Sequence, residues 1–91
     1  MHILDEHKKK YLNRRISEIE ELKQSLGVDD FDIAINIGHR LKGNGETFGY
    51  PIISALGISL EQAGIAKDKV KLREAIKQLE VNVEENLKKI H

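Results

Sequence analysis

The sequence of 91 residues lacks cysteine and tryptophan and contains only one proline. Without cysteine, the chain has no disulfide, no thiolate metal site and no cysteine nucleophile. It also lacks an excess of either charge, because fifteen basic and fifteen acidic side chains give a formal net charge of zero. A nucleic-acid clamp needs a basic face, so we do not expect nucleic acid as a partner.

Long apolar runs and targeting signals are missing as well. No stretch approaches the ~20 apolar residues that span a bilayer, and the first residues do not have the pattern of a signal peptide. We therefore expect no membrane contact and a cytoplasmic location. The length allows one small domain, residues 1–91, and the initiating Met1 favours a complete small protein.

Helical periodicity runs through almost the whole sequence, with apolar residues recurring every three or four positions. We expect helices over about residues 5–26, 30–45, 51–63 and 68–90. Four helices with short connections predict an all-α fold, an antiparallel up-down-up-down four-helix bundle. The predicted core stripes are Leu12, Ile16, Ile19, Leu22 and Leu26; Phe31, Ala34, Ile37, Gly38 and Leu41; Ile52 or Ile53, Leu56, Leu60 and Ala63; and Leu72, Ile76, Leu79, Val83, Leu87 and Ile90.

Local signals set the predicted helix ends. Gly27 and Gly64 are each followed by an apolar residue, a pattern typical of a helix C-terminus in which glycine takes the left-handed conformation. Asp29 or Asp30 is expected to cap the second helix. Pro51 fits the first turn of the third helix, where its missing N–H is not needed.

The second predicted helix carries a histidine on its polar face. At roughly 100° per residue, His39 points away from the apolar stripe and into solvent. Lys42 and Gly43 follow it by three and four positions, and Ile35 precedes it by four, so all three share its face. We therefore expect an exposed imidazole with an ammonium group one turn away, beside a patch without a side chain.

This arrangement suits phosphoryl transfer. A neutral imidazole nitrogen is a good nucleophile at pH 7, since an unperturbed histidine has a pKa of about 6.5. A transferring phosphoryl group spreads negative charge over its oxygens, and Lys42 can supply the balancing cation to a group on His39. Gly43 costs a helix ~1 kcal/mol relative to alanine. We therefore expect another protein's active site to approach the backbone there.

These residues resemble the signature of histidine-containing phosphotransfer (HPt) domains, four-helix-bundle modules of two-component phosphorelays. The family pattern is His-x-Leu-Lys-Gly with a glycine ten residues after the histidine, and His39, Leu41, Lys42, Gly43 and Gly49 match it one for one. The residues that are similar to the family's next helix are Ile53, Leu56, Gly57, Leu60, Glu61 and Gly64.

The resemblance implies a phosphorelay intermediate. Nε2 of His39 would accept a phosphoryl group from the aspartate of a response-regulator receiver domain and later pass it to another receiver. Lys42 would balance the phosphoryl charge, while Ile35, Asn36 and Gly43 would contact the partner. The chain would need no cofactor or metal of its own, because the Mg²⁺ would be bound by the partner receiver. A hybrid or sensor histidine kinase is the other expected partner.

The remaining motif residues would be structural: Leu41 would anchor the helix in the core, and Gly49 would allow the turn into the third helix. Gly38 departs from the family, which often has alanine there, and is expected to loosen the helix. Some kinase-associated members use a carboxylate to orient the histidine Nδ1. Glu46 lies seven residues after the histidine and takes that role only if the helix continues past Gly45.

Two alternative functions fit the same sequence. The bundle can dock receivers or kinases as a regulator without chemistry, or it can be a phosphoacceptor domain excised from a larger histidine kinase. We expect a monomer. A basic run at residues 8–10, with Arg14 and Arg15, is interpreted as a solvated helix face, because acidic residues follow at Glu18, Glu20 and Glu21.

Overall fold

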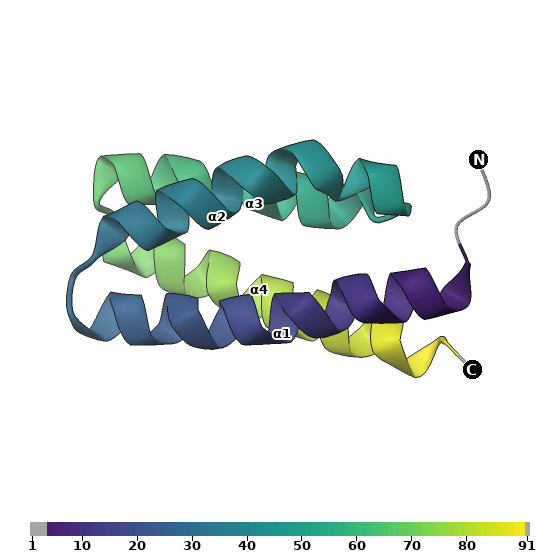
Figure 1. Cartoon of the computed structure of the whole chain (residues 1–91). Helices are drawn as coiled ribbons and strands as arrows, with labels where there is room; N and C mark the ends of the chain where they lie inside the picture. Colours follow the sequence, from purple (N-terminus) through teal and green to yellow (C-terminus); the bar gives the residue numbers. More distant parts are fainter. Residues whose placement is uncertain (1–3, 91) are drawn as a thin grey trace.

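The computed structural model describes residues 4–90, so the outermost residues of the predicted 1–91 domain lie outside it. The predicted all-α bundle is confirmed: consecutive helices run antiparallel, with α2 and α3 in one layer and α1 and α4 in the other (Figure 1). None of the described helices is long and apolar enough to cross a bilayer. The elements are α1 (Asp5–Gly27), α2 (Phe31–Asn44), the short 3-10 helix η1 (Glu46–Phe48), α3 (Pro51–Ala66) and α4 (Lys69–Lys88).

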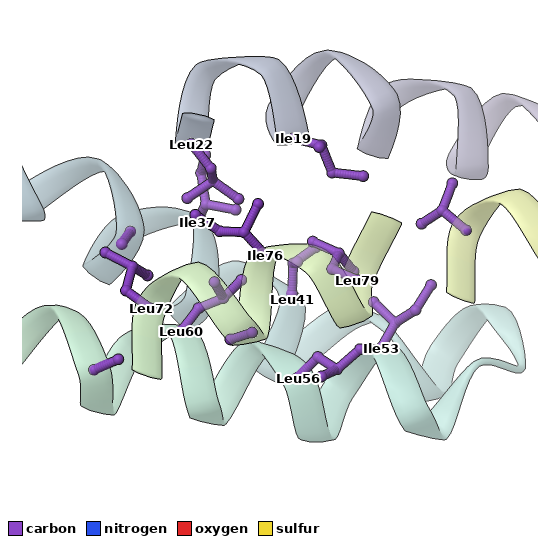
Figure 2. Packing of buried hydrophobic residues seen from close by; sticks show 14 of the residues in the cluster. Ile19, Leu22, Ile37, Leu41, Ile53, Leu56, Leu60, Leu72, Ile76 and Leu79 are labelled. Atoms are coloured by element: carbon purple, nitrogen blue, oxygen red, sulfur yellow. The ribbon is translucent and has the colours of Figure 1, made fainter. Parts of the chain in front are cut away.

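The apolar stripes of the four helices meet in one core, which includes the fully buried Leu41. Ile53, not Ile52, is the inward residue at the start of α3. The side chains that point into the centre of the bundle in Figure 2 include Ile19 and Leu22 from α1, Ile37 and Leu41 from α2, Leu56 and Leu60 from α3, and Leu72, Ile76 and Leu79 from α4.

The predicted stripe of α1 is wrong at one position. Ile16 is 42% exposed, whereas Arg15 and Glu18 are almost completely buried. These two side chains form an ion pair with 2.5 Å between Nε and Oε1. A buried charged pair is tolerated because the two charges face one another and the long stems pack among apolar neighbours.

The backbones of α2 and α3 touch at a pair of glycines. A Cβ added at Gly38 would lie 2.6 Å from the carbonyl oxygen of Gly57 and 2.6 Å from the backbone nitrogen of Glu61. A Cβ at Gly57 would lie 2.5 Å from the backbone nitrogen of Lys42. Gly38 therefore allows a direct contact between the two helices. The sequence predicted only that this glycine would loosen α2.

Two helix ends differ from the predicted ones. α1 continues through Gly27, and the left-handed residue is Asp29, with φ 57°. α3 continues through Gly64 to Ala66, and the left-handed residue is Lys67, with φ 53°. Gly64 is buried because α2 packs on it: an added Cβ would lie 2.9 Å from Cγ1 of Ile35. Glycine serves close packing there, not helix termination.

Aspartate side chains cap the N-termini of α2 and α4. The carboxylate of Asp30 accepts a hydrogen bond from the backbone N–H of Asp32 at 3.2 Å, and Asp68 does the same for Lys71 at 3.1 Å. These acceptors satisfy backbone donors that would otherwise be unpaired at the start of α2 and α4. Pro51 lies in the first turn of α3.

The connection from α2 to α3 is short and hydrogen-bonded. The hydroxyl of Ser54 accepts from the backbone N–H of Glu46 at 2.8 Å and donates to the carbonyl of Leu41 at 3.3 Å. Gly49 has φ 88°, a conformation in which a side chain would be strained. This turn returns the chain so that α3 runs back alongside α2, the helix that carries His39.

Candidate functional site

His39 lies on the outer surface of α2, and its side chain is 68% exposed. Lys42 is one turn further along the same helix and is also exposed. Gly43 beside it is exposed, and nothing lies within 4 Å of the place where its Cβ would be. The imidazole, the ammonium group and the bare patch therefore share one open surface, in the arrangement that the helical spacing predicts.

A carboxylate from the neighbouring helix joins these two side chains. Oε2 of Glu61 lies 2.9 Å from Nδ1 of His39, and its Oε1 accepts a hydrogen bond from Nζ of Lys42 at 3.1 Å. The Glu61 side chain is only 17% exposed. One carboxylate from α3 thus holds both of these α2 side chains.

The glycine contact between the helices places this carboxylate. Glu61 follows Gly57 by one turn of α3, and its backbone nitrogen lies against Gly38 on α2. Because the backbones are in contact at this level, the short glutamate side chain reaches across to α2. A wider separation of α2 and α3 would carry the carboxylate out of hydrogen-bonding distance of His39.

The two donors keep Glu61 ionised. The hydrogen bond from Lys42 and then the one from His39 lower the pKa of the Glu61 carboxyl, and they outweigh partial burial, which acts in the opposite direction. An ionised carboxylate only accepts hydrogen bonds, so Nδ1 must carry the proton in the contact. In the neutral imidazole the lone pair is then on Nε2.

The other predicted site residues lie around this centre. Asn36 is exposed on α2, while Ile35 is half-buried with its side chain against Gly64. Arg40, which was not predicted as a site residue, is turned towards α1, where its Nη2 lies 3.3 Å from Oε2 of Glu18. Glu46 is in η1, beyond the end of α2, and the carboxylate at Nδ1 of His39 belongs to Glu61 instead.

Sequence reasoning missed the role of Glu61. The residue is part of the run that resembles the family's next helix, but its spacing within α3 does not show which side chain of α2 it faces. The available signal was the glycine one turn before it, Gly57, since a glycine in a helix interior is typical of a close approach by another backbone. A matching glycine, Gly38, lies directly before the histidine.

Comparison with known families identifies the family to which this chain belongs. The model of the Hpt domain family matches residues 11–89, which include all four helices except the first turns of α1. The chain belongs to the Hpt domain family, whose members carry out histidine phosphotransfer in two-component phosphorelays. No curated protein and no solved structure shows significant similarity to it.

Proposed function

We propose that this protein is a phosphorelay intermediate in which Nε2 of His39 accepts a phosphoryl group from a receiver-domain aspartate and passes it to another receiver. The observation that carries the proposal is the hydrogen bond between Nδ1 of His39 and the ionised Glu61. It favours the tautomer with a free lone pair on Nε2, on a side chain that is open to a partner.

The chemical step forms one bond and breaks one. The Nε2 lone pair attacks phosphorus, the bond between phosphorus and the aspartyl oxygen breaks, and the electron pair of that bond stays on the aspartate carboxylate. The imidazole keeps its Nδ1 proton and becomes positively charged. Glu61 faces that nitrogen at 2.9 Å and stabilises the developing charge. The reverse attack by a second aspartate returns His39 to its starting state.

Lys42 supports the phosphorylated state. Its ammonium group is bonded to Glu61 at 3.1 Å and is partly exposed, one helical turn from His39. When the phosphoryl group is on Nε2, its oxygens are acceptors for the lysine, because negative charge on them attracts a cation within a few ångströms. The Mg²⁺ and acidic residues that activate the aspartyl phosphate belong to the receiver, so this chain contributes no metal and no cofactor.

The partner is expected to cover the outward face of α2. Gly43 leaves open space beside Lys42, and Asn36 offers an exposed amide one turn before the histidine. Ile35 contributes only the part of its side chain that is not packed on Gly64. The association is expected to be transient, since a relay component must release each partner. The monomeric state and the cytoplasmic location stay predictions.

Transfer of radioactive phosphate from phosphorylated receivers tests the proposal. We expect the protein to take up a label that acid removes and base does not, as phosphohistidine does. His39→Gln should take up none, whereas His7→Gln, which changes an exposed histidine on α1, should be labelled normally. Label that persists in His39→Gln would place the acceptor elsewhere.

The same assay separates the two alternative functions. A docking regulator without chemistry would bind receivers, which a pull-down detects, but would remain unlabelled. A phosphoacceptor domain excised from a kinase would take label from ATP when the kinase's catalytic domain is added, and would take less from receivers. Labelling by receivers alone, in the absence of any kinase domain, supports the relay intermediate.

A further inference from the structure

A cleft of about 620 Å³ lies between the N-terminal half of α1 and the segment where α2 ends and η1 begins. The cleft lies on the side of α2 that faces α1. His39 and Lys42 are hydrogen-bonded to Glu61 of α3, on the other side. The cleft therefore does not belong to the phosphotransfer site. Its volume lies within the roughly 300–1,000 Å³ that is typical of small-molecule sites.

The charged residues that line the cleft are all basic. Lys10 and Arg14 are exposed at its edge, and Arg15 lies deeper, with only 3% of its surface exposed. The sequence predicted that Arg15 lies on a solvated helix face, and this prediction is wrong because the side chain is buried. No acidic side chain lines the cleft among the described residues. A protein with zero net charge concentrates three cations here.

One buried donor in this region is unpaired. Glu18 pairs with the buried Arg15 at 2.5 Å and with the half-exposed Arg40 at 3.3 Å. Nη1 of Arg15 has no hydrogen-bond partner among residues 4–90. A buried guanidinium donor without an acceptor is unfavourable, and an anionic group bound in the cleft would reduce this cost.

The floor of the cleft is aromatic. The rings of Tyr11 and Phe48 stack with centroids 4.3 Å apart and an interplanar angle of 16°. The Tyr11 hydroxyl donates to Oδ1 of Asn44 at 2.6 Å, which ties the ring to the end of α2. The exposed Thr47 adds a hydroxyl at the edge. The Tyr11 ring is held between Phe48 and the guanidinium of Arg15, whose central carbon lies 4.3 Å from the ring centre. The floor is therefore ordered and aromatic, beside cations that attract an acid group.

We propose that this cleft binds a small organic anion, with an apolar body against the Tyr11–Phe48 floor and a carboxylate or phosphate group towards Lys10, Arg14 and Arg15. Three observations support a small molecule: the volume, the ordered aromatic floor, and a charged lining of one sign. The cleft is independent of the phosphotransfer reaction, because it is lined by none of His39, Lys42 and Glu61.

A titration followed by NMR with three matched probes tests this site. The probes are 1-naphthyl phosphate, 1-naphthoate and the uncharged 1-naphthol, which share one ring system and differ in their polar group. We expect either or both anions to shift the amide signals of Tyr11, Asn44 and Thr47, with 1-naphthol binding roughly tenfold more weakly, a difference of about 1.4 kcal/mol. The comparison of the two anions tells which acid group the cleft prefers.

Variants assign the binding to the cleft. The double variant Lys10→Ala/Arg14→Ala should bind the better anion roughly tenfold more weakly, because it removes both exposed cations at the edge of the cleft. Lys9→Ala removes another exposed charge from the same helix but outside the cleft, and should not change the affinity for the anion. Thr47→Trp should fill the cleft and prevent binding while thermal unfolding stays cooperative.

Three outcomes would overturn the proposal. Equal binding of 1-naphthol and the anions would show an apolar surface without charge recognition. Shifts centred on Lys42 and Glu61 would show that the phosphotransfer site attracts the anion. The absence of localised shifts with any probe at millimolar concentration would show that the cleft does not bind this class of ligand.

Discussion

Replacing Gly38 with alanine should separate α2 from α3 at the level where Glu61 meets His39. The new methyl group would lie 2.6 Å from two backbone atoms of α3. Carbon atoms in good contact lie about 3.5–4.0 Å from their neighbours, so the helices must move apart by roughly 1 Å. Overpacking of this kind costs about 1–3 kcal/mol, partly offset by about 1 kcal/mol from the higher helix propensity of alanine.

The displacement acts directly on the site. The Nδ1–Oε2 distance is 2.9 Å, and at about 3.6 Å a side-chain contact no longer counts as a hydrogen bond. Without the Glu61 contact, the proton is no longer held on Nδ1, so the two neutral tautomers should become more evenly populated. Fewer molecules would then present the Nε2 lone pair, and phosphotransfer should slow.

Two measurements follow these effects separately. The ¹⁵N chemical shifts of the His39 ring report the tautomer, and urea unfolding reports stability. Gly43→Ala is the matched control on the same helix, because no atom lies within 4 Å of its added Cβ. It should leave the tautomer unchanged and raise stability by up to about 1 kcal/mol. If Gly38→Ala gives the same ring shifts and the same gain in stability as Gly43→Ala, the argument from the helix contact is refuted.

Three further variants test the site and the core. Lys42→Ala should slow transfer roughly tenfold by removing a cation from the phosphoryl group, with an unchanged helical circular dichroism signal because the side chain is exposed. Glu61 has a pKa below the ordinary value of 4.5, so the stability it adds is complete above pH 4.5 and is lost as the pH falls through the lower, folded-state pKa. Urea unfolding of Glu61→Gln should therefore lack that part of the acid dependence, and an identical pH profile would contradict the ionised contact. Leu41→Ala should cost about 2–5 kcal/mol in the same unfolding assay, because the leucine is completely buried.

The bundle and the exposed face of α2 could be predicted from the sequence because both depend on helical periodicity within single segments. Residues three or four apart share a face in any helix, so His39 and Lys42 come together without tertiary information. Glu61 could not be placed in this way. Its distance to His39 depends on how closely two helices approach and on their relative register, which Gly38 and Gly57 decide jointly.

Glycine and arginine account for the clearest errors. A glycine in a helical pattern can mark a helix end or a close contact with another helix. Gly64 was predicted to end α3, but it lies at a close contact with α2. Arg15 and Ile16 are neighbours in the sequence, so a small rotation of α1 decides which one faces inward. The pairing of Arg15 with Glu18 and the stacking of its guanidinium 4.3 Å from the centre of the Tyr11 ring favour the arginine.

The contact between Gly38 and Gly57 also limits how this protein can change during evolution. A larger residue at either position meets backbone atoms of the opposite helix, which cannot rotate away as a side chain does. Related chains with a side chain at one position must therefore shift the α2–α3 register or spacing, and a carboxylate at position 61 would then lose its reach. We expect the two glycines and the glutamate to be kept or replaced together, as one inherited unit that spans two helices.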